Sequence, residues 1–276
     1  MQMDIENKTF VITGSARGLG AAIAKLAASR GANVVLSDVL DKDGAQTASE
    51  IVKDGGRAVF KHCDVTSQQE CEALMDHAFE QFGSLDVLVN NAGIHEAMVS
   101  DRFVFEEMDV ETFDRVLDVN LRGPFVCSRA ATKYLKQSKR FPSIINAGST
   151  ASFVGYPFGL AYGVSKGGIA LLTKNLAVAL APHGIRSNCY CPASTDTDMV
   201  KDVSATIGSR NFGAAANPNA AQLGAHLVRR IGDVSDIAEL VCFLASDRAS
   251  FINGATVLID GGTLAWRETV DAMGMS

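Results

Sequence analysis

The chain has 276 residues, of which 47% are hydrophobic and 20% are charged, a composition typical of a globular protein with a sizeable core. Its formal net charge of −6 argues against nucleic acid as a partner, because phosphate binding needs an excess of Lys and Arg. No run approaches the roughly 20 uninterrupted apolar residues of a membrane span, and the N-terminal residues lack the apolar core of a secretory signal. We therefore expect a cytoplasmic protein that does not bind membranes.

Predicted strands and helices alternate along the whole chain. The expected strands are Phe10–Thr13, Ala32–Ser37, Ala58–Cys63, Leu85–Asn90, Ser143–Ala147, Arg186–Cys191 and Thr256–Asp260. The expected helices are about Gly18–Arg30, Asp41–Lys53, Ser67–Phe82, Val110–Ser138, Ala161–Pro182 and Ser235–Ser246. Such alternation, with continuous hydrophobic strand cores, predicts an α/β fold with a single Rossmann-type doubly wound parallel sheet of about seven strands and helices on both faces. We expect one domain over residues 1–276, with a mobile substrate flap at about 199–231.

A glycine-rich turn follows the first predicted strand and opens the first predicted helix, with the sequence Thr-Gly-Ser-Ala-Arg-Gly-Leu-Gly from Thr13 to Gly20. Glycines allow a tight turn and a close backbone approach to a pyrophosphate, and the helix N-terminus supplies N–H groups and positive dipole. This position in a βαβ unit favours dinucleotide binding over a simple packing turn. The expected cofactor contacts here are Gly14, Arg17, Gly18, Leu19 and Gly20.

Two acidic residues stand at the ends of the next strands. Asp38 follows Gly20 by 18 residues, where a carboxylate can accept hydrogen bonds from both ribose hydroxyls of an adenosine. A helix N-cap is the alternative role for Asp38. Asp64 and Val65 stand at the end of the third predicted strand, where a carboxylate can meet the adenine amino group or simply shape a turn. Because a carboxylate beside the 2′ position repels a phosphate, Asp38 favours NAD, although Arg17 could attract the extra phosphate of NADP.

Two further motifs complete a family pattern: Asn-Asn-Ala-Gly at Asn90–Gly93 and Tyr-Gly-Val-Ser-Lys at Tyr162–Lys166. With the glycine-rich turn, they resemble the short-chain dehydrogenase/reductase family in its compact single-domain branch, over roughly Lys8 to Gly262. The resemblance implies a catalytic tetrad and further cofactor contacts. The tetrad would be Asn120, Ser149, Tyr162 and Lys166, and the further contacts Asn91, Ala92, Gly93, Thr195 and Thr197, with Tyr162 and Lys166 themselves. The chain departs from the family pattern at Gly148, where a serine is usual, and at Ala193, where a glycine is usual.

The chemistry of the tetrad follows from its residue types. Tyr162 and Lys166 are four residues apart, so they share one face of a helix, and the ammonium can lower the tyrosine pKa from its usual value near 10. Tyr162 could then take the hydroxyl proton of an alcohol while its hydride leaves. Ser149 would hold the substrate oxygen, and by family resemblance Asn120 would hold a water that relays the proton. A bracing role is the alternative for Asn120.

The substrate is expected near the segment between Ser149 and Tyr162, whose aromatic residues suggest a hydrophobic or cyclic molecule, unless they serve the core or an interface. Candidate substrate contacts are Ala151, Tyr156 and His95, the last of which could instead be a solvated loop histidine. The predicted function is NAD-dependent hydride transfer between nicotinamide and a secondary alcohol or ketone. Alternatives are a 3-oxoacyl-thioester reductase, a lyase or epimerase using transient oxidation, and a non-catalytic NAD-sensing Rossmann module.

Two expectations concern metals and assembly. Six scattered cysteines suggest no disulfide framework, and no Cys/His spacing suits zinc, so no metal site is expected. The predicted helices Val110–Ser138 and Ala161–Pro182 are apolar over much of their circumference, more than a single sheet-facing stripe requires. We therefore expect a homotetramer, with a homodimer as the second choice.

Overall fold

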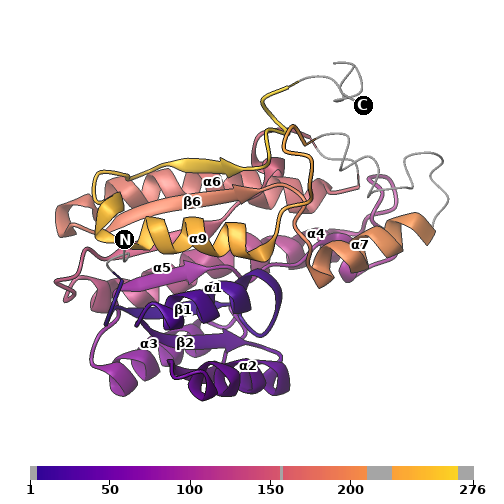
Figure 1. Cartoon of the computed structure of the whole chain (residues 1–276). Coiled ribbons are helices and arrows are strands. Elements are labelled where there is room, and N and C mark those ends of the chain that lie inside the picture. Colours follow the sequence, from indigo (N-terminus) through magenta and orange to yellow (C-terminus); the bar gives the residue numbers. More distant parts are fainter. Residues whose placement is uncertain (1–4, 156–157, 210–225, 267–276) are drawn as a thin grey trace.

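The computed structural model describes residues 5–155, 158–209 and 226–266. It contains one seven-stranded sheet in the order β3-β2-β1-β4-β5-β6-β7, and every neighbouring pair is parallel (Figure 1). This confirms the predicted fold class. The strands are β1 (Thr9–Thr13), β2 (Asn33–Asp38), β3 (Arg57–His62), β4 (Val87–Asn90), β5 (Ser143–Ala147), β6 (Arg186–Pro192) and β7 (Thr256–Ile259).

Helices cover both faces of this sheet. The α-helices are α1 (Gly18–Ser29), α2 (Asp41–Lys53), α3 (Gln68–Phe82), α4 (Val110–Leu117), α5 (Gly123–Leu135), α6 (Leu160–Leu180), α7 (Asp198–Ser209) and α9 (Val234–Ala245). Successive residues of β1 point to opposite faces: Phe10 and Ile12 join the core with α1 and α9, whereas Val11 joins the core with α3 and α5. The inner strands of the sheet are buried on both faces, as their apolar sequences require, whereas the edge strands β3 and β7 are only partly buried.

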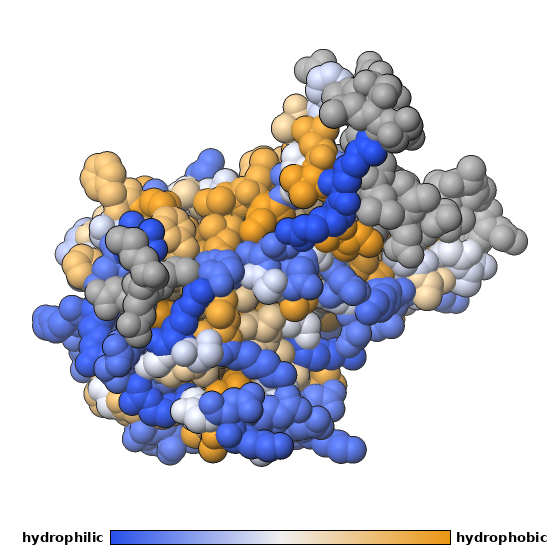
Figure 2. All heavy atoms as spheres, in the orientation of Figure 1, coloured by the Kyte–Doolittle hydropathy of each residue, from blue (hydrophilic) through white to orange (hydrophobic). Residues whose placement is uncertain are grey.

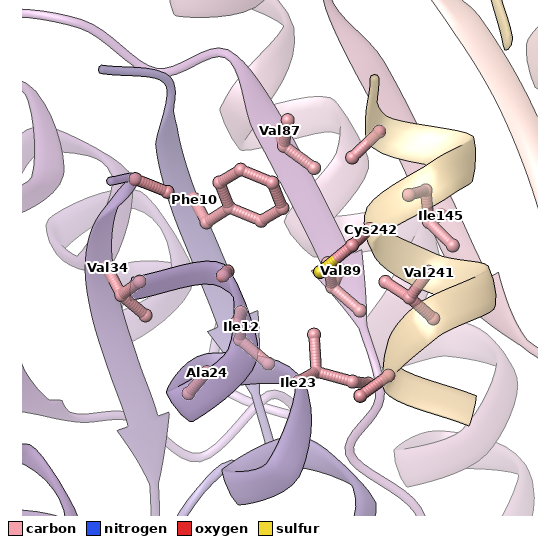
Figure 3. Close-up of a cluster of buried hydrophobic side chains, with 14 of the residues drawn as sticks. Phe10, Ile12, Ile23, Ala24, Val34, Val87, Val89, Ile145, Val241 and Cys242 are labelled. Carbon is pink, nitrogen blue, oxygen red and sulfur yellow. The ribbon is translucent and has the colours of Figure 1, made fainter. Parts of the chain in front are cut away.

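Figure 3 shows the core between the sheet and the helix pair α1 and α9. Phe10 and Val87 from the strands lie beside Val241 and Cys242 of α9, and all four side chains are completely buried. Burial of each large apolar side chain stabilises the fold by about 1.5–3 kcal/mol. The core thus fixes the strand ends, from which the loops that carry the candidate site emerge.

The predicted single helix Val110–Ser138 is wrong, because a π-helical turn, Asp118–Arg122, separates α4 from α5. Pro124 explains the interruption: it has no N–H for the Asn120 carbonyl, and its ring would crowd that carbonyl in a regular helix. The chain instead widens by one residue, and the Gly123 N–H donates to the Asp118 carbonyl. Such π-turns are frequent at functional sites, and this one contains Asn120.

The segment predicted to be a flap begins in helix α7, none of whose residues is buried. Residues 210–225 of that segment lie outside the described residues. One stretch of the described chain, Leu160–His183, is long and apolar enough to cross a membrane by length and composition, with a mean hydropathy of 1.2. It comprises α6 and the short turn after it; α6 packs against β6 and carries the buried Lys166, so we interpret it as a helix that covers the sheet with one face.

Candidate active site

The glycine-rich turn between β1 and α1 packs directly against the loop that follows β4. Gly14 has a φ of +63°, and a Cβ there would lie 2.6 Å from the Ala92 Cα. A Cβ on Gly20 would lie 2.2 Å from the Gly14 carbonyl oxygen. Only glycine fits at these two positions, and the two loops form one continuous backbone surface. Leu19 anchors the turn by packing, partly buried, against the core.

The N-terminus of α1 differs from those of several other described helices. Arg17 is its N-cap and makes no capping hydrogen bond through its side chain, and the first turn holds no acidic residue. By contrast α3, α4 and α9 are capped by the side chains of Ser67, Asp109 and Asp233. Backbone N–H groups without a side-chain cap at a helix N-terminus suit an anion, so this turn fits the pyrophosphate of a dinucleotide.

The carboxylate of Asp38 stands at the end of β2, beside the glycine-rich turn. One oxygen accepts a hydrogen bond from the Ala16 N–H at 3.0 Å, and the other accepts from the Val39 and Leu40 N–H groups at 2.8 and 3.1 Å. The N-cap of α2 is Leu40 rather than Asp38. These bonds hold the carboxylate rigidly next to the first turn, in a position that could face a ribose.

Asp64 and Val65 mainly shape the chain after β3. One Asp64 oxygen accepts from both the N–H and the hydroxyl of Thr66, at 2.9 and 2.8 Å. Burial opposes ionisation of Asp64, yet these hydrogen bonds prevail and lower its pKa. The Val65 side chain is buried, and a Cβ on Gly123 would lie 2.8 Å from it. Asp64 thus takes the turn-forming role that was the alternative, which leaves its second oxygen for a ligand.

Asn91 braces the two loops of the cofactor region. Its amide donates to the Thr13 and Gly14 carbonyls at 3.0 and 2.7 Å, and its carbonyl oxygen accepts from the buried Tyr190 hydroxyl at 2.9 Å. The Thr13 hydroxyl accepts from the N–H groups of Asn91 and Ala92. The side chain of Asn91 therefore holds backbone, and any cofactor contact of this loop falls to its main chain, with Ala92 and Gly93.

Asn120 lies buried between the same loop and helix α6. Its carbonyl oxygen accepts from the Ile94 N–H, and its amide donates to the Ile94 carbonyl, both at 2.8 Å. The amide also donates to the Ser165 hydroxyl at 3.1 Å. The bracing role considered for Asn120 is therefore present in the structure.

Tyr162 and Lys166 meet on one face of α6, as their spacing predicts. The Lys166 Nζ lies 5.3 Å from the centroid of the Tyr162 ring and donates to the Ala147 carbonyl at 2.8 Å. A Cβ on Gly93 would lie 3.6 Å from this Nζ, so the loop after β4 reaches the same point. Burial lowers the pKa of Lys166 to about 8, because the low-dielectric surroundings penalise the ammonium.

Ser149 opens a short 3-10 turn, Thr150–Ser152, that contacts α6. The Ser149 hydroxyl accepts from the Ala151 N–H at 3.1 Å, and the Ser152 hydroxyl donates to the Lys166 carbonyl at 2.8 Å. Ala151, a predicted substrate contact, is buried in this turn. Tyr156, another, lies outside the described residues.

The unusual Gly148 has a local cause in the neighbouring strand. A Cβ there would lie 2.4 Å from the Cys191 Sγ and 2.7 Å from the Cys189 Sγ. These two sulfur atoms are 3.7 Å apart on one face of β6, as strand alternation predicts. The thiols occupy the space that the usual serine side chain would need.

His95 is buried, so the prediction of a solvated loop histidine is wrong. Its ring lies 5.1 Å from the Tyr162 ring, centroid to centroid, with an interplanar angle of 33°. The Nδ1 atom accepts from the Ala97 N–H at 3.1 Å, which places the proton of the neutral ring on Nε2. Burial lowers the pKa of His95 to about 4, so the ring is neutral at physiological pH.

Glu96, beside His95, had no role in the sequence-based prediction. Its side chain is fully buried, and its carboxylate accepts from the N–H groups of Ala161 and Tyr162 at 3.0 and 3.1 Å. Its only signal in the sequence was weak: an acidic residue three positions beyond the motif Asn90–Gly93. The structure brings it to the first turn of the helix that carries Tyr162.

The loop after β6 closes over the glycine-rich turn. A Cβ on Gly18 would lie 3.8 Å from a methyl carbon of Thr197, and Arg17 lies 4.0 Å from the Asp198 carboxylate. Thr195 is buried, and its hydroxyl donates to the Ala193 carbonyl at 3.2 Å. Ala193 is not among the described non-glycine residues with positive φ, so alanine fits there without backbone strain.

Comparison with known proteins identifies the class. Residues 14–263 match the family model described as enoyl-(acyl carrier protein) reductase. The chain is 38% identical to cis-4-hydroxycyclohexanecarboxylate dehydrogenase of Sinomonas cyclohexanicum, over 92% of this chain and 96% of that protein. It is 37% identical to 3beta-hydroxysteroid dehydrogenase 1 of Eggerthella lenta, over 95% of each. A dehydrogenase/reductase from Sinorhizobium meliloti 1021 has a similar structure, with a TM-score of 0.82, 38% identity and coverage of 95% of this chain and 97% of that one.

The chain belongs to the short-chain dehydrogenase/reductase family. Its relatives are named dehydrogenases that act on alcohol groups, and the protein is an oxidoreductase of this type. Members of the family use nicotinamide cofactors. The N-terminus of α1 and the backbone surface formed by Gly14 and Ala92 fit such a dinucleotide.

Proposed function

We propose that the protein is an NAD-dependent dehydrogenase or reductase in which Tyr162 exchanges a proton with a secondary alcohol or ketone. The observation that carries the proposal is the buried Lys166 ammonium, 5.3 Å from the centre of the Tyr162 ring and adjacent to the loop at Gly93. The nicotinamide, when bound, accepts or supplies the hydride.

Each of the four tetrad residues has a separate role in the proposed proton transfer. A positive Lys166 stabilises the Tyr162 phenolate, which makes the tyrosine a usable base near neutral pH. Ser149 donates a hydrogen bond to the substrate oxygen and stabilises the charge that develops there. Asn120 holds the relay water through its main-chain carbonyl. Pro124 supports this assignment, because it has no N–H to donate to that carbonyl.

Asp38 supports NAD as the cofactor. Its carboxylate is held beside the Ala16 N–H, whereas Arg17 is about half exposed and lies 4.0 Å from the Asp198 carboxylate. A 2′-phosphate would meet a fixed negative charge, while Arg17 can turn toward solvent. Asp64, Val65, Thr195 and Thr197 complete the proposed cofactor contacts.

The proposed substrate is hydrophobic or cyclic. The two relatives named above act on a hydroxycyclohexanecarboxylate and on a hydroxysteroid, both of which are ring-shaped alcohols. Phe153 and Val154, between Ser149 and Tyr162, are about half exposed and offer an apolar surface. The neutral His95, with its proton on Nε2, can donate to a polar group of the substrate.

A 3-oxoacyl-thioester reductase is the second candidate, because the description of the matched family model names an acyl-carrier substrate, although an enoyl reductase reduces a carbon–carbon double bond rather than a ketone. The two functions differ in the group attached to the reacting carbon. A screen of cyclic secondary alcohols with NAD⁺, run beside a 3-oxoacyl thioester with NADH, separates them.

Tyr162→Phe tests the mechanism. We expect kcat to fall by about 10²–10⁴-fold, the usual contribution of a positioned acid or base, with NADH affinity nearly unchanged. Steady-state kinetics and NADH fluorescence titration measure the two quantities. A variant with near-normal turnover would remove Tyr162 from the mechanism.

A further inference from the structure

Glu96 is a buried carboxylate whose hydrogen bonds reach across the site. Its oxygens accept from two consecutive backbone N–H groups of α6, at 3.0 Å from Ala161 and 3.1 Å from Tyr162. A buried carboxylate is costly unless such donors compensate it, and the positive end of a helix dipole adds to that compensation. These two bonds therefore offset part of the cost of burying Glu96.

Helix α6 has no cap of its own at this end. Its N-cap is Gly159, which has no side chain, whereas α3 and α9 are capped by Ser67 and Asp233 from the adjoining sequence. The groups that Glu96 satisfies are those an N-cap side chain normally serves. The cap of α6 thus comes from a residue 65 positions upstream.

The position of Glu96 in the chain gives this cap a second consequence. Glu96 lies three residues after Gly93, and Ile94 between them is held through its N–H and its carbonyl by Asn120. These bonds fix the loop at Ile94. Two residues later, the Glu96 carboxylate of the same loop holds the backbone of Tyr162. The ring of His95, between these two anchors, packs against the Tyr162 ring.

We propose that Glu96 is a positioning residue, a buried carboxylate that fixes Tyr162 relative to the loop Asn90–Gly93. The inference rests on the proposed function, in which that loop contacts the cofactor and Tyr162 handles the proton. Tyr162 and Lys166 share one helix, so their mutual distance does not need Glu96. The distance between Tyr162 and the cofactor, in contrast, depends on Glu96.

A pair of variants separates this role from simple helix capping. Glu96→Ala removes both functions, and Glu96→Ala/Gly159→Asp restores a local cap for the same N–H groups. Gly159 has a φ of −141°, which any residue adopts. Ser67→Ala is the matched control, because it removes the cap of α3, a helix that carries none of the proposed catalytic residues.

We expect Glu96→Ala to lower both Tm and kcat, the latter by about 10–100-fold, since a misplacement near 1 Å can cost that much. The double variant should regain Tm and the wild-type acidic limb of the pH profile, because the helix start and the base are restored, while kcat stays low. Ser67→Ala should lower Tm without changing kcat. Recovery of kcat in the double variant, or wild-type kcat in Glu96→Ala, would overturn the proposal.

Glu96→Gln serves if Glu96→Ala does not fold. An amide offers one acceptor oxygen to two N–H donors, so one bond is lost while the volume is kept. We again expect a lower kcat and an unchanged ionisation of Tyr162. Near-ultraviolet titration, with Tyr162→Phe as the reference, measures that ionisation. A wild-type kcat in Glu96→Gln would contradict the proposal. Failure of the proposed function is recognised separately, as full turnover by Tyr162→Phe itself.

Discussion

Lys166 is costly for folding, because its ammonium is buried. Its ammonium donates a hydrogen bond to the Ala147 carbonyl, and burial lowers its pKa to about 8. The same low-dielectric surroundings strengthen the effect of the ammonium on the neighbouring Tyr162 ring. Function at this residue therefore opposes stability.

Lys166→Met should show this conflict as a pH dependence. The unfolded lysine titrates near 10.5 and the folded one near 8, so the unfolded state binds more protons between these values. Wild-type stability should therefore rise by up to about 3 kcal/mol from pH 8 to pH 10.5, relative to Lys166→Met. Urea unfolding at several pH values measures it, with the exposed Lys174→Met as control. Parallel pH curves for Lys166→Met and wild type would contradict the pKa.

Asp38→Ser tests the choice of cofactor. The Asp38 carboxylate is fixed by the Ala16, Val39 and Leu40 N–H groups, so it cannot retreat from a 2′-phosphate. Loss of ribose hydrogen bonds together with charge repulsion is worth about 2–4 kcal/mol, or roughly 30- to 1000-fold preference for NAD. The variant should have lower kcat/KM with NAD⁺ and higher kcat/KM with NADP⁺. Wild-type enzyme that uses NADP⁺ equally well would refute the assignment.

Residues linked by a short, regular spacing were predictable from the sequence. Tyr162 and Lys166 meet because four residues make about one helical turn, and no tertiary information is needed. Glu96 was not predictable in this way, because its partners are 65 and 66 positions away and become neighbours only in the folded sheet. The burial of His95 was missed for the same reason.

At the scale of elements, the sequence patterns located strands better than interruptions of helices. Strands β1 to β7 begin and end within two residues of the predicted limits, because apolar runs leave a clear signal, most of all in the inner strands that are buried on both faces. The π-turn Asp118–Arg122 carries no hydrophobic signal of its own, since the periodicity of α4 continues into α5. Pro124 was the available clue.

Gly148→Ser tests the packing between β5 and β6. A serine introduces atoms where the Cys189 and Cys191 sulfurs lie within 2.7 Å of the new Cβ, and overpacking of this kind costs about 1–3 kcal/mol. The cost should largely disappear in a background of Cys189→Ala/Cys191→Ala, because the thiols no longer occupy the space. Free energies of urea unfolding for the four proteins give the coupling. Additive effects would show that the thiols are not the obstacle.

At the scale of the molecule, the two edges of the sheet differ. Edge strand β3 carries Arg57 and Lys61, charges that discourage pairing with another chain, whereas β7 reads Thr-Val-Leu-Ile. Hydrophobic residues gather over β7 on the face shown in Figure 2, and near it Phe251 is fully exposed. The β7 edge is thus suited to covering by a second copy.

A second apolar surface lies on α5 and α6. It is formed by residues that are each about half exposed or more: Phe125, Val164, Leu171 and Val178. Two separate apolar surfaces on one chain generate a closed tetramer when each pairs with itself about a two-fold axis. This arrangement supports the homotetramer predicted from the two apolar helices.

Light scattering at micromolar concentration should therefore give the mass of four 29.2 kDa chains. Phe251→Arg should yield dimers, because it prevents association through the β7 surface. Leu171→Glu/Val178→Glu should also yield dimers, because it prevents association through the α5 and α6 surface. In both cases a charge buried without a partner opposes association. Combining all three substitutions should give monomers. Val52→Glu on α2 is the control, since Val52 is equally apolar and half exposed but lies toward the charged β3 edge. A monomeric wild type would exclude the tetramer, and a tetrameric Phe251→Arg would remove β7 from the interface.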